Sequence, residues 1–141
     1  MTDDIRARGR CLCGAVEFEV HGPLRPVVAC HCGQCRRWSG HFAAATGARR
    51  GDIHFIADEA LTWFRSSAKA KRGFCRICGS SLFWSEDDSP NMMIMAGALE
   101  PPTGLHTVVN IMVEHKSDYY ELEPDVPHIE GHDHRIAVPE T

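Results

Sequence analysis

Apolar residues recur in short stretches, and their spacing predicts strands rather than helices. Between residues 11 and 20, Val16, Phe18 and Val20 alternate with polar residues, and Gly22-Pro23 ends the stretch. Other strands are predicted at 27–29 (leading into Cys30), 61–65, 80–85, 92–99 and 108–113. A strand pair is expected from 41–46 and 53–56, joined by a turn at 47–51. Since no stretch has a long helical period, the fold is expected to be mainly β, with few or no long helices.

The chain has 141 residues, close to the usual size of one domain, and shows neither an internal repeat nor a linker. We therefore predict a single domain over residues 1–141, with a polar and weakly structured tail from about Pro124. The tail carries several potential metal ligands, but a flexible surface segment is the simpler interpretation. These ligands are His128, Glu130, His132, Asp133 and His134.

Charge and hydropathy exclude two classes of partner. The formal net charge is −4, which argues against nucleic-acid binding, and no apolar stretch is long enough to cross a membrane. The first ten residues, MTDDIRARGR, have no signal-peptide character. The predicted location is the cytoplasm, a reducing compartment in which clustered cysteines more often bind metal than form disulfides.

Seven cysteines stand out, and the CLC and CRIC motifs together supply four of them: Cys11, Cys13, Cys75 and Cys78. Four thiolates are a common closed ligand set for structural zinc. Gly14 and Gly79 directly follow the two motifs, where they allow tight turns and let N–H groups approach the thiolates. The alternative is a thioredoxin-like redox pair in CRIC, which usually needs a βαβ context that the sequence lacks.

The remaining three cysteines, Cys30, Cys32 and Cys35, lie within six residues, and no eighth cysteine completes a second set. Three protein ligands with one exchangeable position are typical of catalytic zinc. A structural site closed by His31, His41 or water is one alternative, and a disulfide with one reactive thiol is another. Two of the three cysteines flank His31 in the sequence, so its ring is poorly placed to join them. We therefore interpret His31 as a nearby supporting or surface group rather than as a ligand.

An open zinc site of this kind predicts thiol chemistry. A substrate thiol bound as fourth ligand would lose its proton and could attack the carbonyl carbon of a small aldehyde. Trp38, next to the cluster, is expected either in the core or in a pocket wall. Several basic residues are interpreted as counter-charge or surface groups, or else as recognising a carboxylate of an anionic thiol. They are Arg36, Arg37, Lys69, Lys71, Arg72 and Arg76.

Four ordered motifs resemble the glutathione-dependent formaldehyde-activating enzyme family, which includes centromere protein V. They are CLCGAVEF at 11–18, CHCGQCRR at 30–37, FCRICGSSLFW at 74–84 and AGAL at 96–99. The resemblance implies antiparallel sheets meeting around a structural zinc, an arrangement called a β-tent. It implies that Cys11, Cys13, Cys75 and Cys78 hold this zinc, and that Cys30, Cys32 and Cys35 hold a second zinc.

The family's named activity combines glutathione and formaldehyde into S-hydroxymethylglutathione. The resemblance therefore implies a zinc-dependent carbon–sulfur lyase whose partners are a small thiol, such as glutathione, and a small aldehyde. Two other hypotheses stay open. One is a zinc-binding module without turnover, and the other is a thiol reductase, as in methionine sulfoxide reductase B, that uses the 30–35 loop. The sequence predicts neither the oligomeric state nor the residues that contact glutathione.

Overall fold

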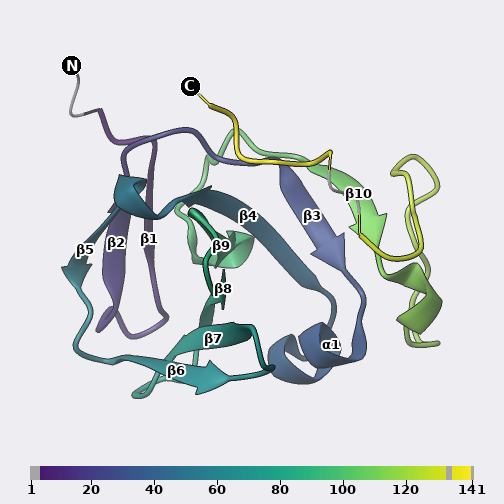
Figure 1. Cartoon of the computed structure of the whole chain (residues 1–141), viewed down its shortest axis with the longest axis horizontal. Coiled ribbons are helices and arrows are strands. Elements are labelled where there is room, and N and C mark those ends of the chain that lie inside the picture. Colours follow the sequence, from purple (N-terminus) through teal and green to yellow (C-terminus); the bar gives the residue numbers. More distant parts are fainter. Residues whose placement is uncertain (1–3, 133–134, 141) are drawn as a thin grey trace.

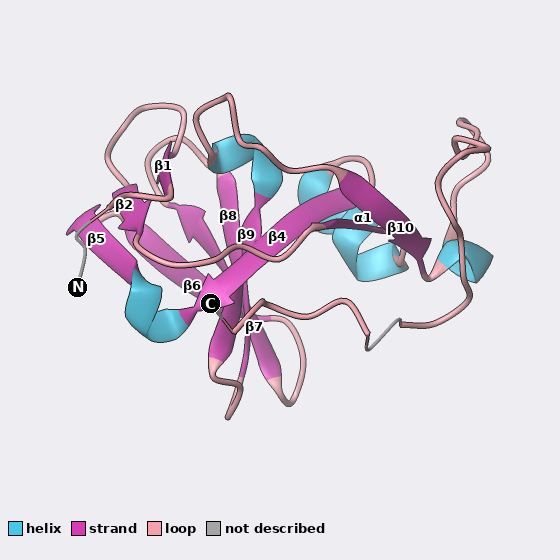
Figure 2. Cartoon of the chain, turned by 90° about the horizontal axis from the view of Figure 1, so that it is seen from above, coloured by secondary structure: helices cyan, strands magenta, loops and turns pink. Residues whose placement is uncertain are grey.

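The computed structural model describes residues 4–132 and 135–140. Strands dominate this part of the chain, and the helical segments are short (Figure 2). The strands are β1 Ala7–Arg10, β2 Glu17–Val20, β3 Val27–Cys30, β4 Ala43–Arg49, β5 Ile53–Ala57, β6 Leu61–Arg65, β7 Ala70–Cys75, β8 Ser81–Glu86, β9 Asn91–Met95 and β10 Thr107–Ile111. The helix α1 spans Gly33–Ser39, and 3-10 turns span Arg50–Asp52, Ala96–Ala98 and Val113–His115.

These strands form two sheets, which confirms the mainly β prediction. The smaller sheet has the order β1-β2-β5, and the larger has the order β10-β3-β4-β9-β8-β7-β6. Neighbouring strands run antiparallel, except that β10 pairs with β3 in parallel. Figure 1 shows the small sheet at one side of the molecule. Helix α1 follows β3 and lies near the ends of β6 and β7.

Most predicted strands are present, with shifted ends. The segment 92–99 is strand only to Met95, because a 3-10 turn then takes over, and 108–113 is strand only to Ile111. Three elements were not predicted: β1, β7 and α1. Each of these contains arginine, and β7 and α1 overlap the cysteine motifs, so hydrophobic periodicity gave no signal for them.

The prediction that 41–46 and 53–56 pair with each other is wrong. Both are strands, but β4 pairs with β3 and β9 in the large sheet, whereas β5 pairs with β2 in the small one. Gly47 is not a turn residue. It lies within β4, where an added Cβ would come within 2.6 Å of the Met93 side chain. The 3-10 turn at Arg50–Asp52 carries the chain from one sheet to the other.

The main core lies between the two sheets and centres on aromatic rings. Phe18 from β2 packs on Phe83 from β8 with ring centroids 5.1 Å apart, and Phe55 from β5 lies 5.6 Å from Phe83. A Cβ at Gly9 would come within 2.3 Å of the Phe18 ring, so this close packing requires glycine in β1. Cys11 and Cys75 belong to the same buried cluster, which brings the first and third cysteine motifs together.

The chain beyond Pro124 lies along β10. The Asn110 N–H donates to the Pro127 carbonyl, and the Ile129 N–H donates to the Asn110 carbonyl. Ile129 and Ile136 pack on a second small core of Val28, Val109 and Ile111. Of the residues noted in the tail as potential metal ligands, Asp133 and His134 fall outside the described residues. Among the residues described, no helix has both the length and the apolar character to span a membrane.

Candidate metal centres

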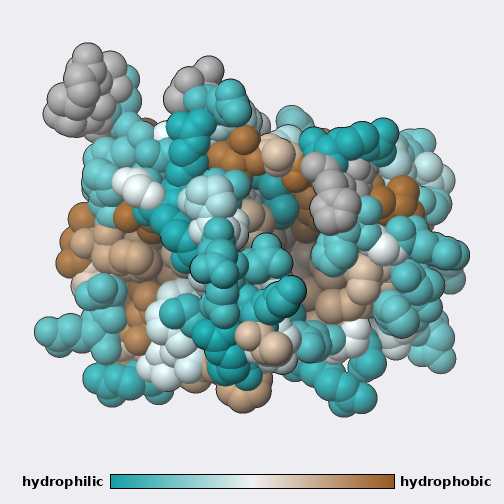
Figure 3. All heavy atoms as spheres, in the orientation of Figure 1, coloured by the Kyte–Doolittle hydropathy of each residue, from teal (hydrophilic) through white to brown (hydrophobic). Residues whose placement is uncertain are grey.

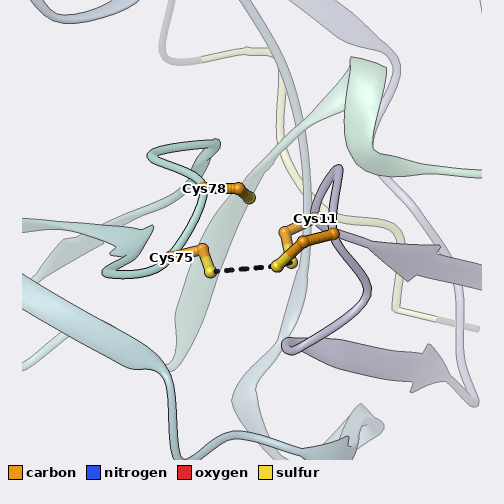
Figure 4. Close-up of side chains that lie close together, drawn as sticks. Cys11, Cys75 and Cys78 are labelled. Carbon is orange, nitrogen blue, oxygen red and sulfur yellow. Dashed lines mark hydrogen bonds between the residues drawn. The ribbon is translucent and has the colours of Figure 1, made fainter.

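The first candidate site, here called the four-cysteine cluster, consists of Cys11, Cys13, Cys75 and Cys78. Its four sulfurs lie within 4.8 Å of one another. Cys11 and Cys13 lie in the β1–β2 loop, Cys75 ends β7, and Cys78 lies in the β7–β8 loop. Figure 4 shows Cys11, Cys75 and Cys78 pointing toward one another. The Cys11–Cys13 and Cys13–Cys75 sulfur distances are 3.7 and 3.8 Å. Zinc at 2.3 Å from four tetrahedral thiolates sets sulfurs about 3.8 Å apart, so this donor set fits zinc.

Both loops have the backbone geometry that the glycines predicted. Gly14 and Gly79 have φ of +84° and +80°, a region that side chains disfavour. The turns direct backbone N–H groups at the sulfurs. The Val16 N–H lies 3.3 Å from Cys11 Sγ, and the Ile77 N–H lies 3.4 Å from Cys75 Sγ. These donors offset the negative charge that four thiolates bring to one point.

Ser80 is a supporting residue that the sequence analysis missed. Its hydroxyl accepts the Leu12 N–H at 2.9 Å and contacts Cys78 Sγ at 3.2 Å, so it links the two loops. The hydroxyl and nearby backbone N–H groups lower the pKa of Cys78 to about 5. Burial raises the pKa of Cys11, but the Val16 N–H and the neighbouring thiols outweigh burial and leave this pKa lowered.

The second candidate site, the three-cysteine cluster, is built locally. Cys30 ends β3, Cys32 caps the N-terminus of α1, and Cys35 lies buried in its first turn. The three sulfurs lie within 4.8 Å of one another. Cys32 Sγ also accepts the Cys35 N–H at 3.4 Å, so the helix cap and the cluster share one sulfur.

Hydrogen bonds between the three thiols separate their pKa values. Hydrogen bonds from Cys30 and Cys35 lower the pKa of Cys32 to about 2, which makes Cys32 the most readily ionised of the three. Hydrogen bonding to Cys32 raises the pKa of Cys30. Cys30 lowers the pKa of Cys35 by hydrogen bonding, but Cys32 and burial leave it raised. All seven cysteines are free thiols in this structure, so no disulfide joins any of them.

His31 is not a surface group. It is 1% exposed, with its Nε2 2.8 Å from Asn110 Oδ1 and its Nδ1 2.6 Å from the Tyr120 hydroxyl. Because the amide oxygen only accepts, Nε2 carries the proton and Nδ1 accepts from Tyr120. Burial lowers the pKa of His31, in agreement with this neutral form.

Neither histidine considered as a fourth ligand joins the three-cysteine cluster. Both ring nitrogens of His31 are hydrogen-bonded elsewhere, and His41 Nδ1 lies 2.6 Å from the Tyr119 hydroxyl. Among residues 4–132 and 135–140, the group with mutually close ligand atoms contains these three cysteines and no histidine or carboxylate. The donor set is therefore three sulfurs, which suits a zinc ion with one exchangeable position.

A small hollow adjoins the buried histidine. It has a volume of about 120 Å³ and is lined by His31, Phe42, Asn110 and Tyr120, together with residues 121–123 and 126. Of the basic residues considered, Arg72 contacts the three-cysteine cluster directly, through Cys35. Trp38 is half-buried and stacks on Arg72 with the guanidinium carbon 5.1 Å from its ring centroid.

The fold and the two thiol clusters thus define a mainly β protein with one closed and one open candidate metal site. The sequence pattern of the glutathione-dependent formaldehyde-activating enzyme family matches residues 6–115, and the chain belongs to this family. Both thiol clusters fall within the matched region.

Individual relatives agree with this membership. An uncharacterized lyase of Schizosaccharomyces pombe is 26% identical over 116 residues, which cover 81% of this chain and 83% of the relative. A Halomonas elongata protein, provisionally named glutathione-dependent formaldehyde-activating enzyme, is 29% identical over 134 residues, covering 82% of this chain and 80% of that one. A crystal structure of a Rhodobacter sphaeroides protein superposes with a TM-score of 0.57 at 28% identity, covering 86% of this chain and 99% of that one. The chain is therefore a member of a formaldehyde-related lyase family.

Proposed function

We propose that this protein is a zinc-dependent carbon–sulfur lyase that adds a thiol, glutathione in the first instance, to formaldehyde or a related small aldehyde, or reverses that addition. The observation that carries the proposal is the unequal number of donors in the two clusters. Four sulfurs gather in one cluster and three in the other, where both nearby histidines have other hydrogen-bond partners.

The proposal assigns a structural zinc to the four-cysteine cluster and a second, exchangeable zinc to Cys30, Cys32 and Cys35. When bound at the second site, zinc supplies a positive charge and one free position at which a substrate thiol is held in its deprotonated form. In the addition, the thiol sulfur bonds to the carbonyl carbon, and the proton lost from sulfur ends on the carbonyl oxygen. The product is a hydroxymethyl thioether, and no oxidant or reductant is needed.

Hydrogen bonds within the chain fix the geometry of the three-cysteine cluster. Asn110 and Tyr120 fix the ring of His31, which lies in the chain between two of the three proposed ligands. Helix α1 fixes Cys32 and Cys35 relative to each other through the cap hydrogen bond. A cluster held in this way needs little rearrangement when a ligand arrives. We also propose that residues 1–141 act as one zinc-binding domain and that the protein works in a reducing, cytoplasmic setting.

The decisive experiment measures zinc content and turnover on the same preparation. Purified protein is analysed for zinc per chain, then mixed with glutathione and formaldehyde, and the exchange between free and adduct signals is followed by NMR. We expect two zinc ions per chain and an exchange rate above that of buffer. The matched variant Cys30→Ser should keep one zinc ion and return the exchange rate to the buffer value.

Two results would count against the proposal. An exchange rate equal to buffer in a protein that holds two zinc ions would remove the named activity. A single zinc ion per chain in the wild-type protein would show that the three-cysteine cluster holds no zinc, and it would favour the redox or binding hypotheses.

One observation favours the second candidate, a zinc-binding module that docks a partner. Leu12 and Ile77, between the paired ligands of the four-cysteine cluster, are 81% and 62% exposed, and Ile56 on β5 is 56% exposed. Ile56 and Ile77 line the same shallow surface hollow, and Figure 3 shows apolar atoms at the surface where β5 lies. A binding module would keep full zinc occupancy and show no effect of small thiols on the second metal.

A further inference from the structure

A buried guanidinium lies against the three-cysteine cluster. Arg72 in β7 is 4% exposed, and its Nη1 and Nη2 are each 3.8 Å from Cys35 Sγ. Nη2 is also 3.3 Å from Gln34 Oε1, and the guanidinium stacks on the Trp38 ring. Strand β7 therefore places a positive charge beside the sulfur of Cys35 in helix α1.

No carboxylate balances this charge in the described part of the chain. The ion pairs there involve Arg8, Arg10, Arg65, His21 and His115, and Arg72 takes part in none of them. Burying a charge is costly unless an opposite charge meets it. Gln34 and Trp38 are neutral, so the Cys35 sulfur is the contact of Arg72 that can carry the compensating negative charge. The position of Arg72 thus suits a Cys35 sulfur that becomes a thiolate on binding a metal ion.

We propose that Arg72 is a positioning residue that compensates the charge of the three-cysteine cluster, so that this cluster holds a metal ion and still accepts an anionic fourth sulfur. The inference rests on the proposed function. Three thiolates and one divalent zinc leave one net negative charge, which the guanidinium cancels. A substrate thiolate would then enter a neutral site rather than an anionic one, which favours its binding. The two-pronged contact with Cys35 also suits arginine better than lysine.

The chain offers a matched control on the same strand. Lys71 is the neighbour of Arg72, but its ammonium lies 4.6 Å from the Trp63 ring centroid and no contact joins it to the cysteines. Lys71→Met therefore removes one positive charge from β7 without touching the cluster. The four-cysteine cluster is an internal control for folding, because its zinc depends on the main core.

The test compares zinc affinity in wild-type protein, Arg72→Met, Arg72→Lys and Lys71→Met. Zinc-loaded proteins are titrated with a chromophoric chelator, which removes the weaker ion first. We expect wild type and Lys71→Met to bind two ions alike. Arg72→Met should keep the tighter ion and bind the second about 10-fold to 100-fold more weakly, the range typical when a group supporting a ligand is lost. Arg72→Lys should fall between them.

A second readout follows the fourth ligand. In protein loaded with cobalt(II), entry of 2-mercaptoethanol sulfur changes the visible absorption. We expect its titration midpoint to rise by about 10-fold in Arg72→Met and to stay at the wild-type value in Lys71→Met. This readout reports accommodation of an anionic sulfur without any turnover.

The outcomes separate the inference from the proposed function. Wild-type protein with one zinc ion overturns both. Wild-type protein with two ions, together with Arg72→Met of equal affinity for the second ion, overturns the inference alone. If Arg72→Met loses both ions through misfolding, Arg72→Lys decides: second-site affinity within about 100-fold of wild type supports the charge role, and complete loss of the second ion overturns it.

Discussion

The two cysteine clusters differ most in how far apart along the chain their members lie. In the four-cysteine cluster, Cys13 and Cys75 are 62 positions apart in the sequence, yet their sulfurs lie 3.8 Å apart. The three-cysteine cluster spans only the six residues from Cys30 to Cys35. A metal in the first cluster would close a long loop between two sheets, and its binding free energy would become folding free energy. A metal in the second cluster would fasten only one strand end to one helix. We therefore expect metal loss from the three-cysteine cluster to cost less folding free energy than metal loss from the four-cysteine cluster.

The two clusters also differ in the groups that surround their sulfurs. The contacts of the four-cysteine cluster are backbone N–H groups and the hydroxyl of Ser80. The three-cysteine cluster instead has a buried cation, Arg72, and lies next to a hydrogen-bonded histidine, His31. A buried charge costs folding free energy unless it is compensated, so the buried Arg72 beside the three-cysteine cluster points to chemistry there.

The largest effect is expected from breaking the four-cysteine cluster. Cys75→Ser removes a fully buried cysteine that we propose as a zinc ligand. Zinc binding in small zinc domains is worth about 10–16 kcal/mol, which rivals the roughly 5–15 kcal/mol stability of an ordinary domain. We expect Cys75→Ser to lack a cooperative thermal transition by circular dichroism. A melting temperature close to that of wild type would show that the cluster is not a structural staple.

The complementary change in the three-cysteine cluster should abolish turnover and spare the fold. Cys32→Ser removes one sulfur, but serine is a good helix N-cap and can still accept the Cys35 N–H. We expect the formaldehyde–glutathione exchange rate to fall to the buffer value while one zinc ion is retained. The melting temperature should change by less than about 5 °C, since 1 kcal/mol corresponds to about 2–4 °C in a chain of this size. Loss of both zinc ions would contradict the division of roles.

A smaller effect tests the neighbour of the open site. Tyr120→Phe removes the hydroxyl that donates to buried His31, and an unpaired buried polar atom costs about 1–3 kcal/mol. The adjacent Tyr119 makes the same kind of bond to His41 but is 59% exposed, so Tyr119→Phe should change stability by less than about 0.5 kcal/mol. Urea unfolding of both variants measures the difference. Equal losses would mean that His31 is not held by Tyr120.

The smallest effect concerns Ser80. Its hydroxyl helps lower the pKa of Cys78 to about 5, so the Cys78 thiolate persists at pH values well below the ordinary thiol range, and we expect zinc binding to persist there as well. Ser80→Ala should raise this pKa toward its usual value, so that protons compete with zinc at higher pH. We expect the pH midpoint of zinc release to move upward. The control Ser89→Ala removes a hydroxyl that accepts the Asn91 N–H rather than contacting a cysteine, and it should leave that midpoint unchanged.

The sequence allowed good prediction of features that depend on local pattern. The strand at 61–65 and the two cysteine groupings follow from alternation and from motif spacing, and the structure has both. Pairing between strands could not be read in this way. The partner of β5 is β2 rather than β4, because the aromatic core of Phe18, Phe55 and Phe83 selects it.

The supporting contacts of the clusters were also beyond the sequence. In the sequence, Asn110 and Tyr120 look like ordinary strand and loop residues. In the structure, both side chains form hydrogen bonds with His31, some 80 to 90 positions away. Arg72 was one of several basic residues near CRIC, and nothing in its spacing distinguished it from Lys71. Such contacts arise from tertiary packing, which brings distant segments together without a periodic signal.

The parallel pairing of β10 with β3 has a consequence for the order of assembly. During synthesis β3 and the cysteine loop emerge early, but β10 and Tyr120 emerge only in the last third of the chain. Until then one edge of β3 has no neighbour and the His31 ring has no partners. Contacts between segments so distant form slowly. The chain therefore forms most of its two sheets before the surroundings of the three-cysteine cluster are complete. In a ribosome-bound intermediate, this cluster should be the last region to become enclosed.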